Sequence, residues 1–145
     1  DLEKAKEPTE YASGIAHHLM GESLMDTSRG IDTVMYREPL GVFAGIAPFN
    51  FPAMIPMGWM APLAIVCGNC FVLKPASSTP MTSLRMARLY AEAGFPDGVL
   101  GVVPCSRNEA ETLLTHPDIN GITFVGSTQV GLHVFYRFKA GWLFG

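Results

Sequence analysis

The chain has 145 residues, of which 48% are apolar and 16% charged, and its net charge is −3. This composition can fill one compact core and excludes a disordered chain, and the absence of a basic stripe excludes a nucleic-acid surface. The chain opens at Asp1 and ends at Gly145 without a polar tail, so we expect a piece of a longer protein. No secretory signal pattern is visible, and three cysteines do not suggest a disulfide framework, which predicts a reducing compartment.

Residues 1–40 predict a helix followed by an edge strand. Apolar residues recur at helical spacing over 8–20, with Pro8 in the first turn and Gly21 as the stop. Residues 31–37 alternate loosely and include β-branched side chains, which is typical of a strand at the edge of a sheet.

The run 39–73 carries no charge and exceeds the roughly 20 residues that a membrane-spanning helix needs. Its prolines argue against such a helix, because each one removes a backbone donor and clashes with the preceding turn. We therefore predict no membrane span. The run instead indicates a buried strand over 41–47, a helix over 52–66 and a buried strand over 70–73.

Helix signals then resume at Thr79, which is a plausible cap, and Pro80, which suits the first helical position. Gly94 closes this helix, and a turn over 96–98 leads into a strand over 99–103.

Ser106 and Glu109 have the spacing of a capping box and predict a helix over 106–116. A strand over 122–125 follows, and a last helix begins at Gly126-Ser127. Buried strands that alternate with helices predict an α/β fold, a Rossmann-like parallel sheet flanked by helices.

Chemistry in such a sheet is expected beyond the carboxyl ends of the strands. Asn50 follows the first buried strand, and its amide either stabilises an oxyanion or bonds its own backbone in a turn. Lys74 ends the second buried strand, where its ammonium either binds ribose or phosphate or extends into water. Ser127 either cradles a phosphate at the last helix or caps that helix. The GxGxxG fingerprint is missing, so a nucleotide would have to be held in another way.

Cys67 and Cys70 form a CxxC pair, which is either a redox pair or two small buried fillers. Redox pairs more often open a helix, whereas this pair spans a helix end and a strand start, so the spacing favours fillers. The four histidines have no metal-ligand spacing, and we predict no metal site.

Taken in order, the motifs "PLGVFAGIAPFNFP", "GNCFVLKPASSTP", "AGFPDGVLGVV" and "HPDINGITFVGST" resemble the aldehyde dehydrogenase superfamily. The resemblance covers about 5–131 and is closest to the CoA-acylating methylmalonate-semialdehyde dehydrogenase branch. It implies an incomplete NAD(P)-binding domain over 41–131, preceded by 1–40 and followed by a divergent or truncated tail over 132–145.

The resemblance also implies roles for single residues. Asn50 matches the amide that donates to the oxyanion of the thiohemiacetal. Lys74 matches the lysine that bonds the adenosine ribose, and Gly126 and Ser127 match the pair that meets the pyrophosphate. Four further positions match the nicotinamide side of the groove: Ile46, Ala47, Pro48 and Phe49.

Three departures from the family pattern stand out. Ser77 replaces a glutamate that grips both ribose hydroxyls, which opens the site to NADP as well as NAD. Cys105 and Ser106 stand where many members carry glycine beside adenine. The nucleophilic cysteine and the general-base glutamate belong to segments beyond Gly131, so we expect this chain alone to be inactive.

The implied function is oxidation of a small semialdehyde to an acyl-CoA, with NAD or NADP as oxidant and CoA as acyl acceptor. Two alternatives remain: a non-catalytic nucleotide-binding or interaction module, and a fragment of an NADP-using succinate-semialdehyde-type enzyme. The resemblance also implies a homo-oligomeric parent in the cytoplasm, or in the mitochondrial matrix of a eukaryote. A sheet cut short exposes an unpaired edge and apolar faces, so we expect poor solubility or self-association.

Overall fold

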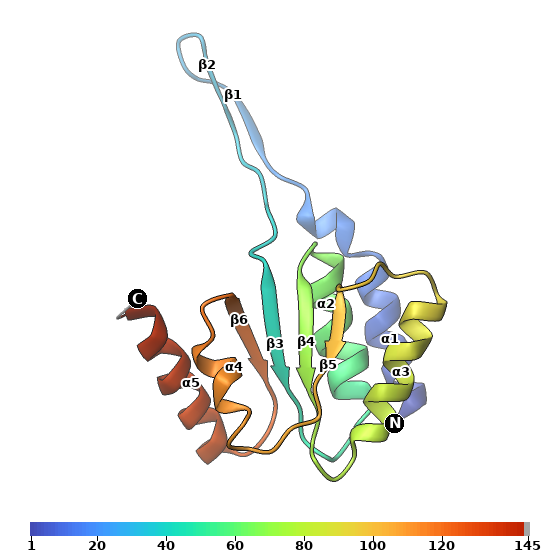
Figure 1. Ribbon diagram of the computed structural model, residues 1–145. Coiled ribbons are helices and arrows are strands. Elements are labelled where there is room, and N and C mark those ends of the chain that lie inside the picture. The colour runs from blue at the N-terminus through green and yellow to red at the C-terminus, as the bar shows by residue number, and fades with distance from the viewer. Residues whose placement is uncertain (144–145) are drawn as a thin grey trace.

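The computed structural model describes residues 1–143. A parallel sheet forms the centre of the molecule, helices cover both of its faces, and a long hairpin projects from one end (Figure 1). The α/β fold predicted from the sequence is confirmed.

Four strands make the central sheet: β3 (Val42–Ile46), β4 (Cys70–Lys74), β5 (Leu100–Val102) and β6 (Ile119–Phe124). They lie in the order β5-β4-β3-β6, and every pair is parallel. The chain therefore steps outward from β3 to β5 and then crosses back to the other side of β3. This reversal of direction beside β3 is the topological switch point at which open α/β sheets bind their ligands.

One face of the sheet packs against η2 (Met54–Met60), α2 (Ala61–Val66) and α3 (Pro80–Glu92). Phe71 and Leu73 project from β4 into this core and are fully buried. Their alternation with Val72 and Lys74 follows from the two-residue period of a strand, which points successive side chains to opposite faces.

The helix predicted over 52–66 is present over 54–66, but its first half is a π-helix. Pro56 and Pro62 lack the backbone N–H that the regular i→i−4 ladder requires. The N–H of Ala61 instead bonds to the carbonyl of Pro56, five residues earlier, which widens the turn. Within the described residues no helix is long and apolar enough to cross a membrane.

The third helix starts with Pro80 in its first turn, and Gly94 follows its end at φ +91°. The N–H of Phe95 bonds to the carbonyl of Tyr90, so the helix closes with the glycine motif expected from the sequence. Thr79 stands at the cap position, but its side chain makes no cap hydrogen bond, and its hydroxyl oxygen is buried without a partner in the described part of the chain.

The opposite face of the sheet carries α4 (Glu111–Thr115) and α5 (Thr128–Leu143). The predicted capping box is confirmed: Ser106 N–H donates to Glu109 at 2.7 Å, and Glu109 N–H donates to the Ser106 hydroxyl at 3.3 Å. The regular helix begins later than predicted, because the residues between the box and Glu111 form turns. The tail expected to diverge after Gly131 continues α5 through Leu143, and its last two residues, 144–145, lie outside the described residues.

The amino-terminal helix α1 (Leu2–Ser13) forms an outer layer on η2 and α2, and a short 3-10 helix η1 (Ile15–Leu19) follows. Gly58 allows this close packing, because a Cβ there would lie 3.0 Å from the backbone of Ala5. The placement of Pro8 in the first turn was wrong, since Pro8 lies inside α1 and the helix begins six residues earlier. Tertiary packing of the first turn against η2 extends the helix beyond the start that the proline predicted.

The strand expected over 31–37 is present as β2 (Ile31–Val34), but it does not border the central sheet. It pairs with β1 (Ser23–Ser28), a strand that we did not predict, in an antiparallel hairpin that reaches away from the body (Figure 1). All residues of both strands are exposed, so their sequence lacks the alternation of apolar and polar residues by which a half-buried strand is recognised. Gly30 (φ +76°) and Asp26 (φ 52°) supply the left-handed backbone near its tip, and Asp26 Oδ1 accepts the Gly30 N–H.

Candidate functional site

The carboxyl ends of the strands meet at one edge of the sheet. Ile46 pairs in register with Lys74 on one side and with Phe124 on the other. Hydrogen bonds continue past the strands, from Ala47 N–H to the Lys74 carbonyl at 3.2 Å and from Val125 N–H to the Ile46 carbonyl at 3.2 Å. Three of the sequence-predicted junctions, those after β3, β4 and β6, are therefore adjacent.

Lys74 projects from this edge into a cavity of ≈ 210 Å³. The side chain is 9% exposed, and it makes no ion pair or hydrogen bond among the described residues. The Nζ atom of Lys74 is not among the buried side-chain atoms that lack a partner in the described residues, so the ammonium keeps access to solvent. A cation at this position favours a ligand that brings hydroxyl oxygens or negative charge. The cavity wall comes from the ends of β3 and β4, the turn before α4, α4 itself and α5: Ile46, Lys74, Arg107, Ala110, Glu111, Leu114, Val130, His133 and Val134.

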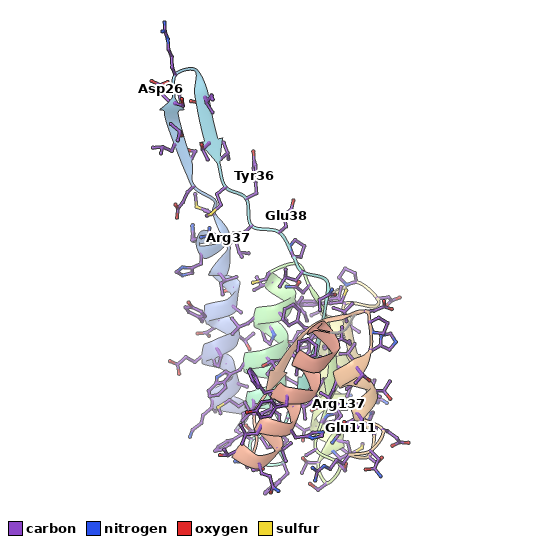
Figure 2. The ribbon with its side chains drawn as sticks, turned by 90° about the vertical axis from the view of Figure 1, so that its left-hand side faces the viewer. Asp26, Tyr36, Arg37, Glu38, Glu111 and Arg137 are labelled. Carbon is purple, nitrogen blue, oxygen red and sulfur yellow. The ribbon has the colours of Figure 1, made fainter. Side chains whose placement is uncertain are left out.

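Glu111 and Arg137 point toward one another from α4 and α5 (Figure 2). His133 Nε2 lies 2.7 Å from Glu111 Oε1, and Arg137 Nε lies 3.8 Å from Glu111 Oε2. The carboxylate of Glu111 is thus engaged by two basic side chains. Arg107, which also lines the cavity, has no such partner in the described part of the chain.

The segment after β3 carries the predicted oxyanion donor. Asn50 is exposed, and its side chain makes no hydrogen bond to other described residues. Phe51 follows in the left-handed region at φ +61°, where a bulky residue is strained. Phe49 is 66% exposed, Pro48 is half-buried, and the Ala47 side chain belongs to the hydrophobic core. The amide of Asn50 is therefore free to meet a ligand.

The junction after β6 has the geometry of an open helix end. Gly126 and Ser127 are both exposed, and α5 begins at the next residue, Thr128. The Ser127 carbonyl accepts the N–H of Gly131 at 2.9 Å, which identifies Ser127 as the cap residue. Free N–H groups in the first turn of such a helix favour an anionic ligand.

Ser77 is exposed, and its hydroxyl donates to the Cys105 carbonyl at 3.2 Å, which ties the loop after β4 to the loop after β5. Burial raises the pKa of the Cys105 thiol, the nearby Lys74 ammonium opposes this, and Glu109 adds to it. Hydrogen bonds from Ser106 lower the pKa of the Glu109 carboxyl. The ionised form of Glu109 is therefore favoured, and its carboxylate is already hydrogen-bonded to Ser106. For Cys105, the raised pKa favours the protonated thiol.

The sequence of this chain matches a known protein family over nearly its whole length. The model of the aldehyde dehydrogenase family matches residues 1–141. The chain belongs to the aldehyde dehydrogenase family.

Relatives of this aldehyde dehydrogenase chain include malonate-semialdehyde dehydrogenase 2 of Geobacillus kaustophilus, with 50% identity over 135 residues that cover 93% of this chain and 28% of that protein. The acylating mitochondrial methylmalonate-semialdehyde dehydrogenase of Arabidopsis thaliana is 47% identical over 140 residues, which cover 97% of this chain and 23% of that protein. The chain thus spans about a quarter of the length of the curated relatives it matches.

Solved structures agree with this likeness. Methylmalonate-semialdehyde dehydrogenase from Oceanimonas doudoroffii superimposes with a TM-score of 0.93 at 44% identity, over 97% of this chain and 28% of that one. An aldehyde dehydrogenase from Bacillus cereus in complex with NAD⁺ gives a TM-score of 0.89 at 33% identity, over 98% of this chain and 29% of that one.

Sequence reasoning missed several residues that line the candidate site. Arg107, Glu111 and His133 line the cavity beside Lys74, but Arg107 stands in a turn and the other two on helix faces, where charged residues usually meet water. Only the packing of α4 against α5 reveals them. Cys67 and Cys70 are half-buried free thiols at the end of α2 and the start of β4, outside this cavity.

Proposed function

We propose that this chain supplies the oxyanion donor and part of the NAD(P) groove of a CoA-acylating malonate- or methylmalonate-semialdehyde dehydrogenase. The observation that carries the proposal is the Lys74 ammonium, which lines a cavity at the switch point of the sheet and has no acidic partner among the described residues. The relatives named for (methyl)malonate semialdehyde, at 47–50% identity, support this substrate class.

The residues at the sheet edge fit a dinucleotide. Lys74 offers a cation to the hydroxyls of the adenosine ribose, and Ser127 and the first turn of α5 offer N–H groups to the pyrophosphate. Ile46, Ala47, Pro48 and Phe49 follow β3 on the nicotinamide side. When bound, the nicotinamide accepts the hydride from the substrate carbon.

Asn50 carries the part of the chemistry that this chain provides. A cysteine thiolate attacks the aldehyde and leaves a negative charge on the former carbonyl oxygen. The exposed amide of Asn50 donates to that oxygen, and one such donor typically contributes about 3–4 kcal/mol. Loss of hydride yields a thioester, which transfers its acyl group to CoA. The cysteine and the general base come from segments that the family places after this part of the chain.

The charges around the cavity favour acceptance of NADP as well as NAD. Lys74 and Arg107 have no acidic partner among the described residues, whereas Glu111 is paired and Glu109 is bonded to Ser106. Ser77 adds no carboxylate that would repel a 2′-phosphate. The uncompensated charge is positive. This feature also supports the alternative of an NADP-using succinate-semialdehyde-type dehydrogenase.

The intact parent is proposed to be a homo-oligomer of the cytoplasm or the mitochondrial matrix. The projecting hairpin supports self-association, since its apolar residues are exposed: Leu24 61%, Ile31 57% and Val34 50%. The bacterial and mitochondrial relatives support the two compartments.

Two measurements test this function. Purified 145-residue chain mixed with malonate semialdehyde, CoA and NAD is expected to produce no NADH, and clear NADH production would contradict the claim that the nucleophile lies elsewhere. Calorimetric titration with NAD and NADP is expected to show binding of both. A chain that binds neither is a bare scaffold, and the proposed nucleotide groove would be wrong.

A non-catalytic nucleotide-binding module is the second candidate, because the exposed Asn50 amide is the only part of the dehydrogenase chemistry that we assign to this chain. Joining the chain to the remaining segments of its natural gene separates the two. Turnover that falls at least about 100-fold in an Asn50→Ala variant of the joined protein supports the dehydrogenase. Absence of turnover in the joined protein with an intact cysteine and glutamate supports the module.

A further inference from the structure

The carboxylate of Asp1 lies against a segment 52 positions further along the chain. Asp1 Oδ2 accepts a hydrogen bond from the backbone N–H of Ala53 at 2.8 Å, and Oδ1 accepts one from Met54 at 3.0 Å. The same side chain makes no cap hydrogen bond within its own helix, α1. Asp1 therefore satisfies the open amino end of η2, where these two N–H groups would otherwise lack a partner.

The segment held by Asp1 includes the strained residue next to the oxyanion donor. Phe51 has φ +61°, a conformation that a bulky side chain keeps only where its surroundings enforce it. Asn50 precedes it and has no side-chain hydrogen bond to the other described residues, so no such bond fixes its amide and its position depends on the backbone that carries it. A change at Phe51 would swing that amide away.

Two further contacts come from the same end of α1. The Lys4 ammonium lies 5.7 Å from the centre of the Phe51 ring, and the backbone of Ala5 packs closely on Gly58. Figure 1 places the amino terminus at the end of the molecule toward which the strand arrows point. The first turn of α1 therefore contacts the segment 51–58 at three places: at the ring of Phe51, at the two backbone N–H groups bonded by Asp1, and at Gly58.

We propose that Asp1 is a positioning residue for Asn50. Its carboxylate holds Ala53 and Met54, keeps Phe51 in the left-handed conformation and thereby presents the Asn50 amide at the carboxyl edge of the sheet. Asp1 does not touch the reacting atoms. The inference rests on the proposed role of Asn50, and its test measures geometry without any reaction.

The test compares isotopically labelled wild-type chain with Asp1→Ala and Asp1→Asn by nuclear magnetic resonance. In Asp1→Ala, hydrogen exchange at the Ala53 and Met54 amides is expected to become about fivefold faster, as for loss of a helix cap. The strong amide-to-Hα Overhauser effect within Phe51, which marks a positive φ, should weaken, and the side-chain amide signals of Asn50 should shift. Asp1→Asn keeps an acceptor oxygen and should restore most of the wild-type pattern.

Glu3→Ala is the matched control, because it removes a carboxylate from the same turn of α1 that bonds only to Lys6 in the described structure. It should leave the signals of Phe51 and Asn50 unchanged. If Asp1→Ala speeds exchange at Ala53 and Met54 but leaves those signals as in the wild type, Asp1 is a helix cap alone and the proposal is wrong.

If Asp1→Ala does not fold, Asp1→Glu takes its place. It keeps the charge but moves the carboxylate by one methylene, so it should disturb Phe51 more than Asp1→Asn does, and the reverse order would overturn the proposal. NAD binding measured on the wild-type chain reports separately on the proposed function, since failure to bind NAD leaves the geometry of Asn50 untouched.

Discussion

Replacing Lys74 with methionine should weaken nucleotide binding without weakening the fold. Methionine matches the lysine stem in length, so it fills the same part of the cavity wall but removes the ammonium. Hydrogen bonds to a charged group contribute about 1.5–3 kcal/mol, which predicts a rise in Kd of roughly 10- to 150-fold for NAD.

Stability should change little. The Lys74 ammonium keeps access to solvent and has no acidic partner among the described residues, so it contributes little to the stability of the unliganded chain. Removing its charge should change the free energy of unfolding by no more than about 0.5 kcal/mol. A residue required for the fold would instead lose stability on substitution.

Calorimetric titration with NAD and urea denaturation measure the two effects on the same samples. Lys6→Met is the control for net charge, because Lys6 is 65% exposed and, among the described residues, pairs only with Glu3. It should change neither quantity by more than a small amount, since exposed ion pairs contribute about 0–1 kcal/mol. A Kd for Lys74→Met within twofold of wild type, or a clear loss of stability, would refute the assignment of Lys74 to the nucleotide.

Four further substitutions test other parts of the structure. Gly58→Ala should destabilise the chain by roughly 1–3 kcal/mol in urea denaturation, because the new Cβ would meet the Ala5 backbone at 3.0 Å; an unchanged midpoint would show that α1 can move aside. Thr79→Val should be neutral or stabilising in the same assay, since the buried hydroxyl has no partner in the described residues and a loss would reveal one. Burial raises the pKa of Tyr90 to about 12, above its unfolded value of about 10, so its contribution to stability is complete below pH 10 and is lost as pH rises toward 12. Tyr90→Phe should therefore flatten the loss of stability over that range in pH-dependent unfolding, and an unchanged slope would assign the loss to other groups. Ser77→Glu should weaken NADP binding more than NAD binding in calorimetry, because a carboxylate would repel the 2′-phosphate, and equal losses would contradict that reason.

The order of the central elements could be predicted from the sequence because each one is marked locally. The strands β3, β4 and β6 are short apolar runs bounded by proline, glycine or polar residues. The spacing of Ser106 and Glu109 indicates the capping box that they form. The hairpin of β1 and β2 could not be predicted in this way, because neither strand buries a face. A helix start is also ambiguous locally: α1 begins before Pro8 because its first turn packs on η2.

The sequence by itself determined where the candidate chemistry lies along the chain. Asn50, Lys74 and Ser127 each follow a buried strand, and parallel strands end at a common edge, so their meeting could be expected from the pattern alone. Only the tertiary structure decided what surrounds them. The cavity that Lys74 shares with Arg107, the pairing of Glu111 with His133 and the hydrogen bonds from the start of η2 to Asp1 all join residues far apart in sequence. Such contacts depend on how helices pack across the sheet, and the periodicity of a single segment does not encode them.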